Sequence, residues 1–121
     1  MIPSEVVEFI QSSIKSVWAA ETLLLLRRRS DRSWTADELI RELRSSRSVV
    51  AENLATFLQA GLATEEEGQF RYAPASAELD RIVHELEMAY AERPTAVVKA
   101  IMAAPSDKLQ IFADAFRIKK D

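Results

Sequence analysis

The stretch from Thr35 to Gly61 constrains the fold most, because it contains two signals for the start of a helix and one for the end. Thr35 and Glu38 have the spacing of a capping box, in which the hydroxyl and the carboxylate each bind an unpaired backbone amide. Ser46 is a second amino-terminal cap, and Gly61 is the residue type that ends helices in the left-handed conformation. The sequence therefore predicts a short helix, a tight turn and a second helix over 46–60, which form a helix-turn-helix.

The residues after this glycine change from a helical to an alternating pattern. Leu62 and Thr64 precede a polar turn that contains Gly68, and Phe70 and Tyr72 follow it. Two short alternating runs around a glycine-containing turn are typical of a β-hairpin. Helix, helix and hairpin in this order predict a winged helix.

Further helices are predicted on both sides of this core, because the 121 residues include only two glycines and four prolines. The length fits one domain over residues 1–121. We predict a mainly α fold, a winged helix-turn-helix with additional terminal helices. Its predicted parts are a leading helix over 3–13, a winged-helix core over 14–73, and carboxyl-terminal helices over 76–118 that include 95–104 and a last helix capped by Ser106.

Several classes of function lack their characteristic residues. The chain has no cysteine, and His84 is its only histidine, so we predict no metal site and no cofactor. It has no Ser-His-Asp order, glycine-rich phosphate loop or H-E-x-x-H motif, and we predict that it is not an enzyme. The most apolar run, Val17–Leu26, is about half of the ~20 residues that cross a membrane. No basic leader precedes it, so we predict a cytoplasmic protein with no membrane association.

The positive charges are concentrated in one part of an acidic chain. The net charge is −3, but residues 27–47 hold seven arginines and four carboxylates, a balance of +3. A local basic surface can bind phosphates even when the whole protein is anionic. Solvated arginines that pair with neighbouring carboxylates are the alternative. We name this set the arginine island: Arg27, Arg28, Arg29, Arg32, Arg41, Arg44 and Arg47.

The segment SRSVVAENLATFLQAGLA resembles the recognition helix of MarR/PadR-type winged-helix transcription regulators. The similarity includes a capping serine, a buried valine, two buried positions of the leucine type and the A-G-L ending. These residues are Ser46, Val50, Leu54, Phe57 and Ala60-Gly61-Leu62. The resemblance extends over roughly Trp18–Ala73, and it implies that the second helix enters the major groove while the hairpin lies along the neighbouring backbone.

The resemblance also implies which residues would contact DNA. Arg47 is the candidate for a purine edge, and the hydroxyls of Ser46 and Ser48 would hold a phosphate with the helix amino end. The exposed positions of the second helix are Arg47, Ser48, Val49, Ala51, Glu52 and Ala55. The full predicted DNA-binding set is Arg28, Arg29, Arg32, Arg44, Ser46, Arg47, Ser48, Glu52 and Arg71.

Two features depart from the pattern of a DNA reader. Glu52 stands where relatives often have a cation, and the hairpin carries Glu65–Glu67 with Arg71 as its one cation. Carboxylates repel phosphates. We therefore predict a transcription regulator that binds double-stranded DNA. The one alternative is a winged helix repurposed as a protein-interaction module, which presents Val49, Ala51, Ala55 and the acidic hairpin to a basic or apolar partner.

The aromatic residues are predicted to lie in the core or at an interface. Trp18, Trp34, Phe57, Phe70 and Tyr72 lie at buried-period positions without interleaved lysines, which favours a core over a platform for single strands. Terminal helices often form the dimer in such regulators. We therefore predict a homodimer through residues 76–118, with Tyr90, Phe112 and Phe116 at the interface.

Overall fold

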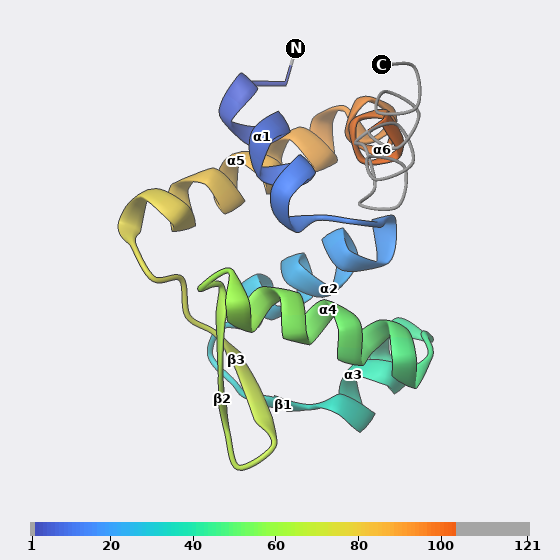
Figure 1. The fold of residues 1–121 in the computed structure, drawn as a ribbon, viewed down its shortest axis with the longest axis vertical. Helices are drawn as coiled ribbons and strands as arrows, with labels where there is room; N and C mark the ends of the chain where they lie inside the picture. The colour runs from blue at the N-terminus through green and yellow to red at the C-terminus, as the bar shows by residue number, and fades with distance from the viewer. Residues whose placement is uncertain (1, 104–121) are drawn as a thin grey trace, which may run out of the picture.

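The computed structural model describes residues 2–103, which are mainly α-helical with one small antiparallel sheet (Figure 1). The elements in order are α1 (Ser4–Ser13), α2 (Val17–Arg28), β1 (Trp34–Thr35), α3 (Ala36–Leu43), α4 (Arg47–Gln59), β2 (Ala63–Glu66), β3 (Gln69–Tyr72), α5 (Ala77–Glu92) and α6 (Pro94–Ala103). The predicted last helix, with Phe112 and Phe116, lies outside the described residues.

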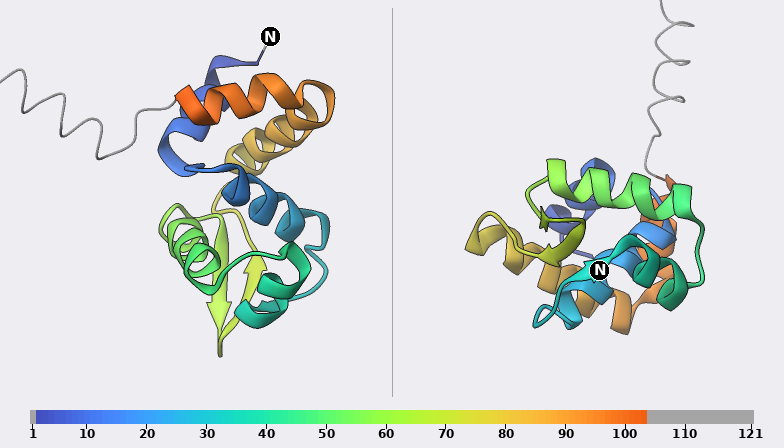
Figure 2. Two further views of the ribbon diagram at one scale, coloured as in Figure 1. Left: turned by 90° about the vertical axis from the view of Figure 1, so that its right-hand side faces the viewer. Right: turned by 90° about the horizontal axis from the view of Figure 1, so that it is seen from below.

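The elements form two groups that meet at α2. One group contains α1, α5 and α6, which contact one another. The other contains α3, α4 and the sheet, and α2 contacts all three. Figures 1 and 2 show the β2–β3 hairpin projecting from the end of the molecule opposite α1 and α6. The hairpin tip is therefore far from the terminal helices.

The predicted helix starts are confirmed by their caps. The Thr35 hydroxyl accepts a hydrogen bond from the Glu38 amide, and the Glu38 carboxylate accepts one from the Thr35 amide at 2.8 Å. Ser46 caps α4 by accepting from the Val49 amide at 3.3 Å. Ser76 caps α5 in the same way. Each of these oxygens binds an amide that has no partner inside its own helix.

Left-handed residues end the two helices of the predicted helix-turn-helix. Arg44 has φ 54° directly after α3, and Gly61 has φ 75° after α4. The left-handed conformation of Arg44 ends α3, and a short turn then leads to α4. Gly61 turns the chain into β2, and the Ala75 amide donates to the Gly61 carbonyl at 2.8 Å. The glycine thus lies against the segment that follows the hairpin.

The predicted hairpin is confirmed, with a two-residue turn at Glu67 and Gly68, which both have positive φ. This geometry matches the twist of the two strands. Strand β1 was not predicted. It pairs with β3 through Trp34 opposite Phe70 and gives the strand order β1-β3-β2. Two residues are too short for an alternating pattern to be recognised.

Every helix contributes to the hydrophobic core. Phe57 of α4 is fully buried, and Trp34 is 5% exposed. Phe70 and Tyr72 are half-buried against the core. The prediction that Trp18 is a core residue is wrong, because its side chain is 43% exposed. It lies at the first turn of α2, beside Leu43 at the end of the short α3, where the described residues cover only part of the indole.

The remaining helix boundaries agree closely with the predicted ones. The leading helix ends at Ser13, and Arg93 separates α5 from α6. We predicted that α6 would begin at Thr95, but it begins at Pro94. Proline is favoured at the first position of a helix, because the amide that it lacks would have no partner there.

Candidate nucleic-acid interface

The exposed face of α4 carries small side chains and one carboxylate. The helix buries Val50, Asn53, Leu54 and Phe57, so its core-facing stripe is continuous. The residues exposed on the other side are Arg47, Ser48, Ala51, Glu52, Ala55 and Gln59, and Val49 is half-buried. After Arg47 the helix presents no cation to solvent.

Several predicted site residues lie together at the amino end of α4. The hydroxyls of Ser46 and Ser48 are 3.3 Å apart, and Arg47 directly follows the cap. Arg44 is exposed in the left-handed turn. The Arg47 guanidinium binds the Asp37 carboxylate at 2.8 Å, with both side chains at least two-thirds exposed. An exposed ion pair of this kind contributes ~0–1 kcal/mol, so Arg47 can exchange this partner for another.

The first two arginines of the island bind a carboxylate of α5. Glu87 accepts from Arg27 at 2.6 Å and from Arg28 at 3.0 Å. Arg27 and Glu87 are only about one-fifth exposed, at 21% and 20%. Because the pair is largely desolvated, its attraction is screened less than that of a surface pair. Arg28, which we predicted to contact DNA, is thus a link between α2 and α5.

Arg29 and Arg32 also have carboxylate partners. Arg29 lies 3.6 Å from Asp31. The Arg32 guanidinium lies 3.7 Å from the centre of the Trp34 ring and binds the Glu38 carboxylate at 3.0 Å. The pKa of Glu38 lies below its usual value, first because the Thr35 amide donates to it and then because of Arg32. Arg32 therefore stabilises the start of α3.

The hairpin adds negative charge to the region that contains the arginine island. Glu65, Glu66 and Glu67 are exposed, and Arg71 donates from Nε to the Ser30 carbonyl at 3.1 Å. Residues 27–73 hold eight arginines and eight carboxylates, so this region has no net charge. Five of the seven arginines in the island pair with carboxylates. Arg41 and Arg44 form no ion pair with any residue in 2–103.

The two tyrosines of the chain connect α5 to the rest of the fold. Tyr72 of β3 donates to Asp80 at 2.6 Å, and Tyr90 donates to Glu21 of α2 at 2.8 Å. Burial, followed by the neighbouring carboxylate, raises the pKa of both phenols. Tyr90, which we placed at a dimer interface, is half-buried with its hydroxyl bound inside the chain.

The role of Glu87 could not be predicted from the sequence, because this residue lies 59 and 60 positions from its two arginines and no local pattern connects them. The contact between Arg32 and Trp34 could have been predicted from their spacing, since residues two apart in an extended segment lie on one side.

In the described part of the chain, no group of three or more His, Cys, Asp or Glu residues could hold a metal ion. None of the helices in residues 2–103 is long and apolar enough to cross a membrane.

Comparisons with protein-family models, with curated proteins and with solved structures find no match for this chain.

Proposed function

We propose that α2–β3 form a winged helix-turn-helix of the MarR/PadR type and that this module docks a protein partner through α4 and the hairpin. The order of a short α3, a left-handed turn, a longer α4 and a two-residue hairpin supports the fold. The observation that carries the function is the surface of α4, which combines small side chains with one carboxylate, Glu52, and has no cation after Arg47.

The chemistry of this surface defines the partner. Ala51 and Ala55 lie one turn apart on the exposed face, so another helix or strand can approach α4 closely there. Glu52 lies on the same face, and the hairpin that follows α4 carries three further exposed glutamates. The matching surface is apolar at its centre and basic at its rim, because charge complementarity guides association and excludes wrong partners.

The arginine island supports a protein partner over DNA, because most of its arginines already bind carboxylates of the fold. A DNA-binding surface needs arginines that can each neutralise a phosphate. Here Arg27 and Arg28 form ion pairs with Glu87 of α5, and Arg32 forms one with Glu38 at the start of α3. Moving them to a phosphate would break contacts inside the fold.

Arginine substitutions on α4 test the docking surface. In Ala51→Arg/Ala55→Arg, two long cations cover the centre of the proposed contact, so proteins that bind the native chain should be lost. The matched control is Ala77→Arg/Ala91→Arg, which adds the same charge at exposed positions of α5. Quantitative mass spectrometry of proteins retained by each full-length chain provides the comparison, followed by binding measurements on the recovered partner. Equal retention by the two variants would contradict the proposal.

DNA binding is the second candidate, and one observation favours it. Arg41 and Arg44 are exposed without an ion pair in the described residues, and Arg47 and two serine hydroxyls lie at the adjacent amino end of α4. A helix amino end with cations and hydroxyls suits a phosphate. This candidate predicts that Arg44→Ala/Arg47→Ala weakens duplex binding, whereas Arg93→Ala/Lys99→Ala, which removes the same charge elsewhere, does so much less. Equal effects of the two variants would reject a specific phosphate site.

We also propose a homodimer formed through residues 76–118, as expected from the sequence. Sedimentation of the full chain would test this proposal. A monomer at high concentration would contradict it.

A further inference from the structure

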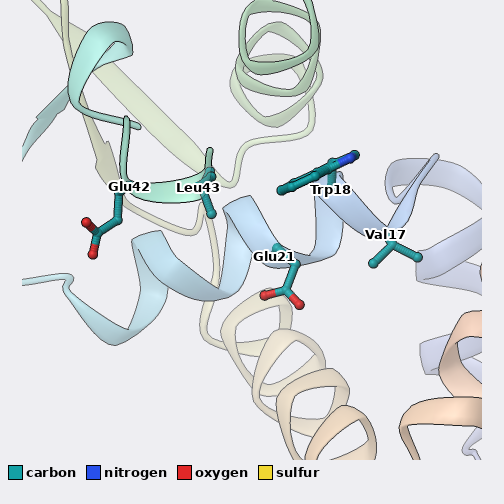
Figure 3. A pocket seen from close by; sticks show the side chains of 5 residues that line it. All are labelled: Val17, Trp18, Glu21, Glu42 and Leu43. Carbon is teal, nitrogen blue, oxygen red and sulfur yellow. The ribbon is translucent and has the colours of Figure 1, made fainter. Parts of the chain in front are cut away.

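An apolar groove with acidic edges lies between the amino end of α2 and the carboxyl end of α3. Its volume is about 360 Å³, and it is lined by Val17, Trp18, Glu21, Glu42 and Leu43. Figure 3 shows the Trp18 indole reaching toward Leu43, with the two carboxylates flanking them. The groove is separate from the α4 surface of the proposed function.

The exposure of Trp18 is the unusual feature of this groove. A tryptophan that is 43% exposed leaves a large apolar area in water, whereas the other tryptophan of the chain is 5% exposed. Glu21 is held in place because it accepts the Tyr90 hydroxyl at 2.8 Å. Glu42 is exposed and forms no ion pair within residues 2–103. The groove thus offers an apolar wall and two negative charges to a partner that is apolar and basic.

The chain itself contains a segment of this chemistry. The sequence continues through residues 104–121, where Phe112 and Phe116 are four positions apart and Arg117, Lys119 and Lys120 follow. Residues four apart share one side of a helix, so the sequence pattern combines an apolar stripe with a basic end. This composition matches the apolar and acidic lining of the groove.

The end of α6, which directly precedes this segment in the sequence, lies on the side of the molecule where α2 begins. Helix α6 contacts α1, and the left view of Figure 2 shows the last turn of α6 on the same side of the molecule as the connection from α1 to α2. That connection leads directly to Val17, the first residue of the groove lining. A helix rises ~1.5 Å per residue, so the residues from 104 to Phe116 can span ~20 Å.

We propose that residues 106–120 dock into the Trp18 groove of their own chain, with Phe112 and Phe116 against the indole and the basic residues near Glu21 and Glu42. The contact would cover the exposed indole and join the carboxyl terminus to the helix-turn-helix.

Fluorescence of the full-length chain tests the contact. Phe112→Ala/Phe116→Ala should expose Trp18, which shifts its emission to the red and increases quenching by acrylamide. The matched control, Gln110→Ala/Asp114→Ala, removes two side chains one turn apart on the opposite side of the predicted helix and should leave both readouts at the native value. Trp34 is buried away from this groove and contributes equally in all chains. Equal emission and quenching in the native chain and both variants would overturn the proposal.

A disulfide test distinguishes the chain's own segment from that of a second copy. The protein has no cysteine, so Glu42→Cys/Lys119→Cys introduces a single possible pair. Mild oxidation of the full-length variant should give a disulfide within the monomer, in higher yield than for Gln59→Cys/Lys119→Cys, where Gln59 is exposed at the far end of α4. Disulfide-linked dimers, or equal yields for the two pairs, would overturn docking within one chain.

Discussion

The Arg27–Glu87 pair should stabilise the fold far more than the Arg47–Asp37 pair, although the two distances are similar. The former joins α2 to α5 at 2.6 Å with both side chains about one-fifth exposed, and the latter spans 2.8 Å with exposures of 75% and 66%. Removing one partner of a buried pair leaves an uncompensated charge, which costs about 3–5 kcal/mol when burial is complete.

The expected magnitude follows from this partial burial. Glu87→Gln keeps the shape of the side chain but leaves Asp80, 3.6 Å away, as the one carboxylate near Arg27 among the described residues. We therefore expect a coupling free energy of about 2 kcal/mol for Arg27 and Glu87, below the fully buried limit. For Arg47 and Asp37 we expect less than about 1 kcal/mol, because water screens exposed pairs.

Two double-mutant cycles measure these couplings. The first combines Arg27→Met with Glu87→Gln, and the second combines Arg47→Met with Asp37→Asn. Urea unfolding followed by circular dichroism gives the free energy of unfolding for each variant. Equal couplings in the two cycles would refute the reasoning that Arg27 is fixed within the fold while Arg47 remains free to change partners.

Two further predictions concern the turns and the tyrosines. Gly61→Ala should lower the free energy of unfolding by more than the ~1–2 kcal/mol of left-handed strain expected for Gly68→Ala, because its new Cβ would lie 3.1 Å from the Ala75 Cβ while Gly68 faces open space; equal losses in urea unfolding would contradict this. Because burial raises the pKa of Tyr72 and Tyr90, their stabilisation should be complete below about pH 10 and be lost as the pH rises further. Ultraviolet absorbance of the native chain should show little tyrosinate at pH values where the unfolded chain is ionised, and coincident titrations would contradict this.

The local structure could be predicted from the sequence because its causes are local. Thr35 and Glu38 cap α3 from three residues apart, and Ser46 caps α4 in the same way. The hairpin depends on Gly68 and the alternating residues around it. Each of these elements is determined by groups within a few positions of one another.

The candidate site could be predicted only in part, because its electrostatics depend on contacts between distant segments. The sequence located the arginine island but could not reveal that Glu87 of α5 binds Arg27 and Arg28. Trp18 was assigned to the core from its spacing, yet its exposure depends on where the short α3 ends. Charge and periodicity along the chain do not specify which partners tertiary packing supplies.

The most direct test of the proposed function is the binding of the native full-length chain to a labelled random-sequence duplex over a range of salt concentrations. Each phosphate contact contributes ~0.9 to the slope of log K against log salt. We predict no measurable affinity even at low salt, because five of the seven island arginines already bind carboxylates and α4 exposes Glu52 with no cation after Arg47. A slope of about −2.7, as three contacts from Arg41, Arg44 and Arg47 would give, would contradict the protein-docking assignment and favour DNA binding.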